Sequence, residues 1–199
     1  MSVRVPGLPE LSWTHGEGDV RVVDDTLILT SAGHVDWTND ATGRHPFQHA
    51  ATSLGFAVDG DFVLSARVRV PGRRTTFDAG ALTLWSGPDH WAKLCFELSP
   101  QGEAMIVSVV TNRYSDDVDS TVVADDHAFL RLARIGEAYV FHSSSDGRTW
   151  RFVRLFRMTT DGPFAAGLMA QSPLGERCVA EFADIRFEER TLLELRDGS

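Results

Sequence analysis

The chain has 199 residues, of which 43% are hydrophobic and 24% are charged, with 17 glycines and 8 prolines. This composition is typical of a folded globular protein. The formal net charge of −9 at pH 7 argues against nucleic acid or an anionic membrane surface as the main partner, because both favour basic patches. We expect a single domain over residues 1–199, with a core at about 13–187 and a C-terminal tail at 188–199.

The sequence shows no pattern of a secretory signal, of a membrane-spanning segment or of a cysteine metal site. The start MSVRVPGLPELSW lacks the charged and apolar regions of a secretory signal, and no run of about 18 apolar residues is present. We therefore expect a cytoplasmic protein. Cys95 and Cys178 lie in strand-like runs and fit no metal-ligand spacing. We expect both to be reduced and buried, and we expect no metal and no cofactor.

Alternation of apolar and polar residues, the pattern of half-buried strands, recurs from the start of the chain. VRVVDD and TLILTS flank Asp24-Asp25 and predict a first hairpin. Residues 32–52 follow, rich in turn-forming residues and rings. Irregular segments of this length inside a compact domain are usually functional. Residues 62–70 then alternate again and predict a strand that ends at a Pro-Gly pair.

The segment from Phe77 to Asp117 carries the most informative pattern. In its WAKLCFEL run, alternation separates two sets, Ala92, Leu94, Phe96 and Leu98 on one face and Trp91, Lys93, Cys95 and Glu97 on the other. The first set predicts a core face. The second places a cation, a carboxylate and a large ring on one sheet surface, which indicates a binding groove.

Turn positions extend this face to neighbouring strands. If SGPDH joins ALTLW to WAKLCFEL, then Thr83 lies opposite Lys93 and Trp85 lies opposite Trp91. If residues 99–102 form the next turn, Ser108 also lies opposite Lys93. The predicted surface consists of Thr83, Trp85, Trp91, Lys93, Glu97 and Ser108, with Asn112, Tyr114, Ser115 and Asp116 at its rim.

The second half of the chain repeats the strand pattern. FLRLARIG, EAYVFHSSSDGRTW and RFVRLFRM predict three strands, and Asp146-Gly147 predicts a two-residue type I′ hairpin turn. AAGLMAQSP and CVAEFADIRFEE complete the set. About ten to twelve strands without a long amphipathic helix predict an all-β sandwich of two packed antiparallel sheets.

The order of FDAGALTLWSGPDHWAKLCFEL, VSVVTNRYSDD, SSDGRTW, GLMAQSP and EFADIRF resembles the DUF1349 family, also labelled as related to regulation of enolase, over about Trp13 to Phe187. The family pattern is carried by Trp91, Lys93 and Glu97 and by residues 111–116. The resemblance implies a concanavalin A-like jelly-roll β-sandwich of the lectin and glucanase superfamily. It also implies a carbohydrate ligand on a concave sheet face.

Catalysis on such a face requires a second carboxylate. Retaining glucanases place two carboxyl groups about 5 Å apart, whereas the alternating neighbours of Glu97 are Cys95 and Ser99. Asp116 and Asp78 lie near strand ends, but Asp78 is out of phase with the Thr83 face. Glu97 is therefore the only catalytic candidate, and the sequence favours non-catalytic binding of a carbohydrate or a similar polar small molecule.

The same residues have structural interpretations. Lys93 and Glu97 lie about 13 Å apart along a strand and can each form cross-strand ion pairs, and Trp85 and Trp91 can form an aromatic pair. Asp36 and Trp37, in the 32–52 segment, are further ligand-binding candidates. The acidic run Asp116, Asp117 and Asp119 lacks the glycine and glutamate of a calcium loop and is interpreted as a solvated turn.

Two other functions stay open. One is a glycan-active hydrolase or lyase that uses Glu97 as acid or base. The other is a protein-interaction or homodimerisation module that uses the aromatic surface.

Overall fold

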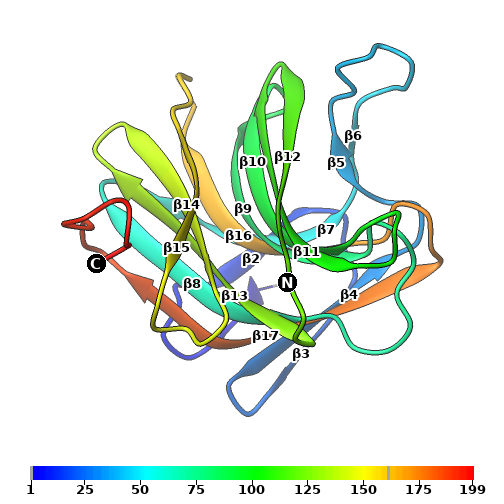
Figure 1. The fold of residues 1–199 in the computed structure, drawn as a ribbon, viewed down its shortest axis with the longest axis horizontal. Coiled ribbons are helices and arrows are strands. Elements are labelled where there is room, and N and C mark those ends of the chain that lie inside the picture. The colour runs from blue at the N-terminus through cyan, green and yellow to red at the C-terminus, as the bar shows by residue number, and fades with distance from the viewer. Residues whose placement is uncertain (1, 161) are drawn as a thin grey trace.

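Two antiparallel sheets packed face to face form the protein, as the computed structural model of residues 2–160 and 162–199 shows (Figure 1). Within these residues every regular element is a strand. The expected all-β sandwich is therefore confirmed. No helix in the described residues is long and apolar enough to span a membrane.

The eight-stranded sheet contains the segment predicted to form the groove. Its order is β1-β2-β7-β16-β9-β10-β11-β12. The strands are β1 (Ser2–Val3), β2 (Leu11–His15), β7 (Thr52–Val58), β16 (Phe164–Gln171), β9 (Ala79–Gly87), β10 (His90–Leu98), β11 (Ala104–Asn112) and β12 (Tyr114–Val122). The edge strand β12 contains the acidic run that was interpreted as a solvated turn.

The seven-stranded sheet forms the other layer, with the order β15-β14-β13-β8-β17-β4-β3. Its strands are β15 (Arg151–Phe156), β14 (Ala138–Ser144), β13 (His127–Ile135), β8 (Phe62–Arg69), β17 (Arg177–Glu188), β4 (Thr26–Ala32) and β3 (Asp19–Val23). The hairpin predicted around Asp24-Asp25 joins β3 to β4.

Apolar side chains from both sheets fill the space between them. Ala92, Leu94 and Phe96 of β10 pack in one buried cluster with residues of the opposite sheet such as Leu64 and Phe182, and each of these side chains is at most 1% exposed. The predicted core face of β10 is confirmed for these three residues, whereas Leu98, the fourth, is only half-buried and lies outside the core cluster. Because side chains alternate along a strand, Trp91, Lys93, Cys95 and Glu97 face outward from the sandwich.

The register of the groove strands matches the prediction on one side of β10 only. Lys93 pairs with Thr83 of β9, as predicted. On the other side Lys93 pairs with Val109, and Ser108 pairs with Leu94, so the predicted pairing of Lys93 with Ser108 is wrong by one residue. The connection includes Ser99 to Glu103, because the Ser99 hydroxyl accepts the Glu103 amide at 3.1 Å and closes a turn one residue longer than expected.

The predicted two-residue turn at Asp146-Gly147 is also wrong. Strand β14 ends at Ser144 and β15 begins at Arg151, so a longer loop joins them. Gly147 has a positive φ of 68°, whereas a type I′ turn needs two such residues. The Asp146 carboxylate instead organises the loop by accepting the amides of Arg148 and Thr149, both at 2.8 Å.

The residues after β17 pack back onto the seven-stranded sheet. Leu192 is 4% exposed and forms a small apolar cluster with Val63, Ala133 and Val140 on the outer face of this sheet. Cys95 and Cys178 are buried free thiols, as expected.

Candidate functional site

The segment 32–52, here called the covering segment, lies over the outer face of the eight-stranded sheet. It contains the short hairpin of β5 (Trp37–Thr38) and β6 (Gln48–His49), which rises beside β12 in Figure 1. Trp37 is its main apolar anchor. The Trp37 ring lies 4.9 Å from the Trp85 ring and 5.8 Å from the Trp91 ring, measured between centroids, and only 1% of Trp37 is exposed.

Asn39 supplies the polar anchor of the covering segment. Its side-chain amide donates to the backbone oxygens of Pro88 and Arg113 at 2.9 and 2.8 Å, and its carbonyl oxygen contacts the His49 ring nitrogen at 2.7 Å. Its backbone exchanges hydrogen bonds with Ser115. Asn39 thus ties the covering segment to the β9–β10 and β11–β12 turns, which lie at the same end of the groove strands.

Replacing Asn39 with alanine is expected to cost about 2 kcal/mol of stability, because buried polar partners lose their hydrogen bonds. Amide hydrogen exchange should show faster exchange within 32–52 than in the wild-type protein, while β13 and β14 stay protected. Unchanged exchange in the covering segment would show that Trp37 and the contacts of Lys93 with Asp36 and the Trp37 backbone hold it in place without Asn39.

Lys93 lies beneath the covering segment and is the only lysine in the sequence. Its ammonium donates to Asp36 Oδ1 at 2.7 Å, to the Trp37 backbone oxygen at 2.8 Å and to Gln171 Oε1 at 2.9 Å. An ammonium has three N–H groups, so these contacts use its full donor capacity. The Lys93 side chain is 4% exposed and that of Asp36 is 20% exposed.

Gln171 of β16 connects Lys93 to Glu97. Because its Oε1 accepts from Lys93, its amide nitrogen must point the other way, and it donates to the Phe77 backbone oxygen at 3.0 Å and to Glu97 Oε2 at 3.3 Å. Glu97 is 8% exposed. Within residues 2–160 and 162–199, Glu97 Oε1 has no hydrogen-bond partner.

A cavity of about 210 Å³ opens beside this network. We call it the Lys93 groove, and its lining consists of Asp36, Trp37, Thr38, Phe77, Lys93, Glu97, Val107, Val109, Asp117, Asp119 and Gln171. Ligand pockets for drug-sized molecules are typically 300–1,000 Å³. The Lys93 groove is therefore suited to a small ligand with several polar groups.

Burial and charge shift the pKa values of three groups in the groove. Burial raises the pKa of Glu97 to about 8 against the opposing effect of Lys93, with Asp36 and Asp117 adding to the rise. Asp117 keeps contact with solvent, yet desolvation by the groove wall still raises the pKa of its carboxyl. Burial alone would lower the pKa of Lys93, but the Asp36 carboxylate and other acidic groups hold it above its usual value. At pH 7 Glu97 is therefore mainly protonated and Lys93 is charged.

Four of the predicted ligand-binding residues line the groove. These are Asp36, Trp37, Lys93 and Glu97. Asp36 is held in place from both sides, because its carboxylate accepts the Trp37 amide at 2.7 Å and its backbone oxygen accepts the Ala50 amide at 3.0 Å. The predicted ion pair of Lys93 thus forms with the covering segment and not with a neighbouring strand.

Three predicted residues of the sheet lie elsewhere. Trp91 and Thr83 share the outer face with Lys93, but they are 0% and 2% exposed and line no part of the groove. The Trp37 ring covers Trp91 and also contacts Trp85. Ser108 points into the sandwich because of the register described above, and its side chain is fully buried.

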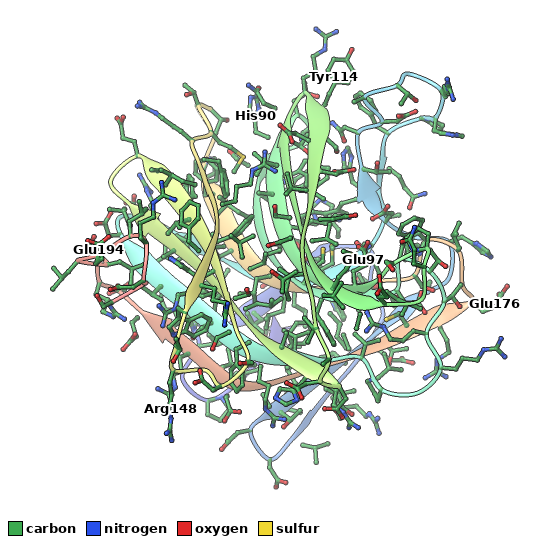
Figure 2. The ribbon with its side chains drawn as sticks, viewed as in Figure 1. His90, Glu97, Tyr114, Arg148, Glu176 and Glu194 are labelled. Carbon is green, nitrogen blue, oxygen red and sulfur yellow. The ribbon has the colours of Figure 1, made fainter. Side chains whose placement is uncertain are left out.

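The predicted rim lies at the opposite end of the strands. Figure 2 shows Tyr114 at the tip of the β11–β12 hairpin, well separated from Glu97. Asn112 pairs with Tyr114 across this hairpin. The Tyr114 ring contacts Phe47 of the covering segment, and Ser115 binds Asn39. Asp116 forms an ion pair with Arg154 at 3.2 Å.

Asp117, Asp119 and Gln171 are the groove residues with a carboxylate or amide side chain that sequence reasoning missed. The acidic run is exposed, as expected, but its interpretation as a turn is wrong, because Asp117 and Asp119 belong to the edge strand β12 and line the groove. They are two residues apart, the spacing of side chains on one face of a strand. That spacing was the available signal. Gln171 follows an apolar alternating run on β16, whose position beside β9 was not predicted.

Solved structures with a similar fold include proteins of several kinds. One is described as a functionally unknown protein from Saccharomyces cerevisiae, with a TM-score of 0.80, 23% identity, and coverage of 89% of this chain and 95% of that chain. A legume lectin-like domain from Entamoeba histolytica has a TM-score of 0.60 and 12% identity, with 90% of each chain covered. A xylan beta-1,4-xylosidase from Bacillus halodurans has a TM-score of 0.66 and 13% identity, with 81% of this chain and 33% of that chain covered.

Sequence comparison gives a more specific relationship. The curated protein "Regulation of enolase protein 1" from Saccharomyces cerevisiae is 34% identical over 113 residues, which span 55% of this chain and 56% of that protein. The family described as "Protein of unknown function (DUF1349)" matches residues 13–190. This match covers the seven-stranded sheet, the eight-stranded sheet except β1 and the first two residues of β2, and all residues of the Lys93 groove. The chain therefore belongs to the DUF1349 family.

Proposed function

We propose that this protein binds a small carbohydrate or a similar polar molecule in the Lys93 groove without catalysing a reaction on it. The observation that carries the proposal is the buried network of Lys93, Asp36, Gln171 and Glu97 beside a cavity. Apolar residues of similar volume often stabilise a fold as well as buried charges do. A buried charged network beside a cavity is therefore better explained by ligand recognition than by stability.

The surroundings of the network support this reading. Around the network, Ala79, Ala81, Trp91, Cys95 and Met169 form one buried apolar cluster on the outer face under the covering segment. Polar groups that converge within an otherwise apolar surface fix the orientation of a ligand. The similar folds of a lectin-like domain and of a xylosidase are consistent with a carbohydrate, although fold alone does not determine function.

Ligand binding should depend on Glu97, which lines the groove, and not on Asp116, which lies outside it. We expect Glu97→Ala to weaken ligand binding ten- to a hundredfold, which corresponds to about 1.5–3 kcal/mol for a hydrogen bond to a polar or charged group. The measurement is a ligand-observed NMR titration of a panel of monosaccharides, disaccharides and polar metabolites. Asp116→Ala is the matched control, because Asp116 lies on β12 but pairs with Arg154.

Either of two results would contradict the proposal. One is a wild-type protein that binds no member of the panel. The other is a folded Glu97→Ala variant, shown by cooperative thermal unfolding, with the affinity of the wild-type protein.

A second candidate function, glycoside hydrolysis, gains support from Asp117 and Asp119. The sequence offered no second carboxylate next to Glu97, whereas β12 brings two into the same groove. Asp119 pairs with Val107, which pairs with Cys95, so its backbone lies about 9–10 Å from β10. In this reaction, protonated Glu97 gives its proton to the leaving glycosidic oxygen as the C–O bond breaks. An aspartate removes a proton from the water that attacks the anomeric carbon.

Hydrolysis makes a distinct prediction. Turnover of aryl glycosides should fall by about 10²–10⁴-fold in Glu97→Gln, the usual contribution of a general acid, and should persist in Asp116→Asn. Release of no aryl alcohol by the wild-type protein from any glycoside of the panel would exclude this candidate and leave the binding proposal intact.

A further inference from the structure

The Lys93 groove offers a ligand more hydrogen-bond acceptors than donors. All three N–H groups of Lys93 are used by Asp36, Trp37 and Gln171, and the amide nitrogen of Gln171 is used by Phe77 and Glu97. The two residues that look like donors for a ligand therefore have no donor capacity left. The polar side chains of the groove that remain are the carboxyl groups and the Thr38 hydroxyl.

The charges are unbalanced in the same direction. Four carboxyl groups line the groove, from Asp36, Glu97, Asp117 and Asp119. Asp36 forms its ion pair with Lys93 at 2.7 Å and Glu97 is protonated, so the negative charge without a partner is that of Asp117 and Asp119. In the described part of the chain, Asp117 and Asp119 have neither an ion-pair partner nor a side-chain hydrogen bond. They differ in this from Asp116 on the same strand, which is paired with Arg154.

One carboxyl oxygen of Glu97 is free of partners among the residues that the structure describes, and it lies at the cavity. Its side chain is more than nine-tenths buried and lines the cavity, yet only Oε2 has a partner in the protein, the Gln171 amide. In the described residues Oε1 has no hydrogen-bond partner and is not fully buried, so it is open to the cavity. The second carboxyl oxygen of Glu97 is therefore available to a ligand that also reaches Asp117 and Asp119.

We propose that the ligand of the Lys93 groove carries a positively charged amine beside its hydroxyl groups, as an amino sugar does, and that Asp117 and Asp119 receive this amine. This inference rests on the proposed function and specifies the chemical class of the ligand. A neutral sugar would supply hydroxyl donors to the carboxylates but would leave their charge uncompensated. An ammonium supplies both donors and charge, and hydrogen bonds between ionised groups are roughly twice as strong as neutral ones.

The test compares sugars that differ at one position. Glucosamine, glucose and N-acetylglucosamine, and the corresponding galactose series, are titrated into the full chain at pH 6.5 by ligand-observed NMR. We expect each amino sugar to bind at least tenfold more tightly than its neutral counterpart at low ionic strength. The preference should shrink as salt is added, because salt screens charges near the surface.

Variants assign the preference to named residues. The double variant Asp117→Asn, Asp119→Asn should bind amino and neutral sugars with similar affinity, since the amides keep the shape of the groove but remove its charge. Asp116→Asn, the control from the same strand, should keep the preference. Thermal unfolding of each variant verifies that it is folded.

The outcomes separate this inference from the proposed function. If neutral sugars bind as tightly as amino sugars, the inference that the ligand carries an amine is wrong, and the proposed binding function still stands. If no sugar binds, both the inference and the proposed function are wrong. Binding that requires Ca²⁺ and is lost on addition of EGTA would show that a metal ion balances the charge of the carboxylates. This result would also contradict the inference that the ligand carries an amine.

Discussion

Replacement of Lys93 by methionine is expected to lower the free energy of unfolding by about 3–5 kcal/mol at pH 7, the usual result of removing one partner from a buried ion pair. Methionine fills a similar volume but donates no hydrogen bond. The Asp36 carboxylate, the Trp37 backbone oxygen and Gln171 Oε1 would each lose their donor. Urea unfolding followed by tryptophan fluorescence measures this change.

An exposed ion pair provides the matched control for Lys93. Arg69 contacts Asp126 at 2.8 Å with 43% of its side chain exposed, so Arg69→Met should cost at most about 1 kcal/mol. Adding Asp36→Asn to Lys93→Met should recover part of the lost stability, because the unpaired carboxylate is then removed. A Lys93→Met variant within 1 kcal/mol of the wild-type protein would show that the network contributes nothing to the native state.

Replacement of Glu97 by glutamine is expected to stabilise the protein under alkaline conditions by roughly 3–5 kcal/mol at pH 9. In the folded protein the pKa of Glu97 is raised to about 8, mainly by burial, from a reference value of 4.5. Between these two pH values the folded state binds more protons than the unfolded state. The stability contributed by protonated Glu97 is therefore present below about pH 4.5 and is lost as the pH rises through 8.

Glutamine resembles the protonated form of Glu97 at every pH, so the variant should lose this part of the pH dependence. Urea unfolding at pH 4, 7 and 9 should give similar stabilities for the two proteins at pH 4 and the widest gap at pH 9. Glu176→Gln, at an exposed position, should follow the wild-type protein within about 0.5 kcal/mol. Parallel curves for Glu97→Gln and the wild-type protein would show that Glu97 is ionised in the native state at neutral pH.

Local pattern was enough to predict the sandwich and part of the groove. The two-residue period of β10 separated Lys93 and Glu97 from the core residues, and it depends only on backbone geometry. The β9–β10 register also followed from its turn. The β10–β11 register did not, because the Ser99 hydroxyl stabilises a longer turn, and one added residue moved Ser108 to the other face.

The errors at the site have two physical causes. Strand β12 lies at a sheet edge, where a polar sequence protects against unwanted pairing, so its sequence resembles a turn although Asp117 and Asp119 line the groove. The covering segment is held by contacts distant in sequence, such as the bonds from Asn39 to Ser115, 76 positions away. No local pattern encodes which part of the sheet such a segment covers, so the burial of Trp91 could not be predicted.

The single buried lysine limits the reaction of the folded chain with reagents that attack lysine side chains. All other basic side chains that carry a full charge at neutral pH are arginines, and the Lys93 side chain is 4% exposed beneath the covering segment. An acyl group, a crosslinker or a ubiquitin chain directed at lysine would reach its target only after the covering segment opens or the domain unfolds. Lysine labelling of this chain therefore counts opened molecules, and the native fold is protected from lysine-linked marking.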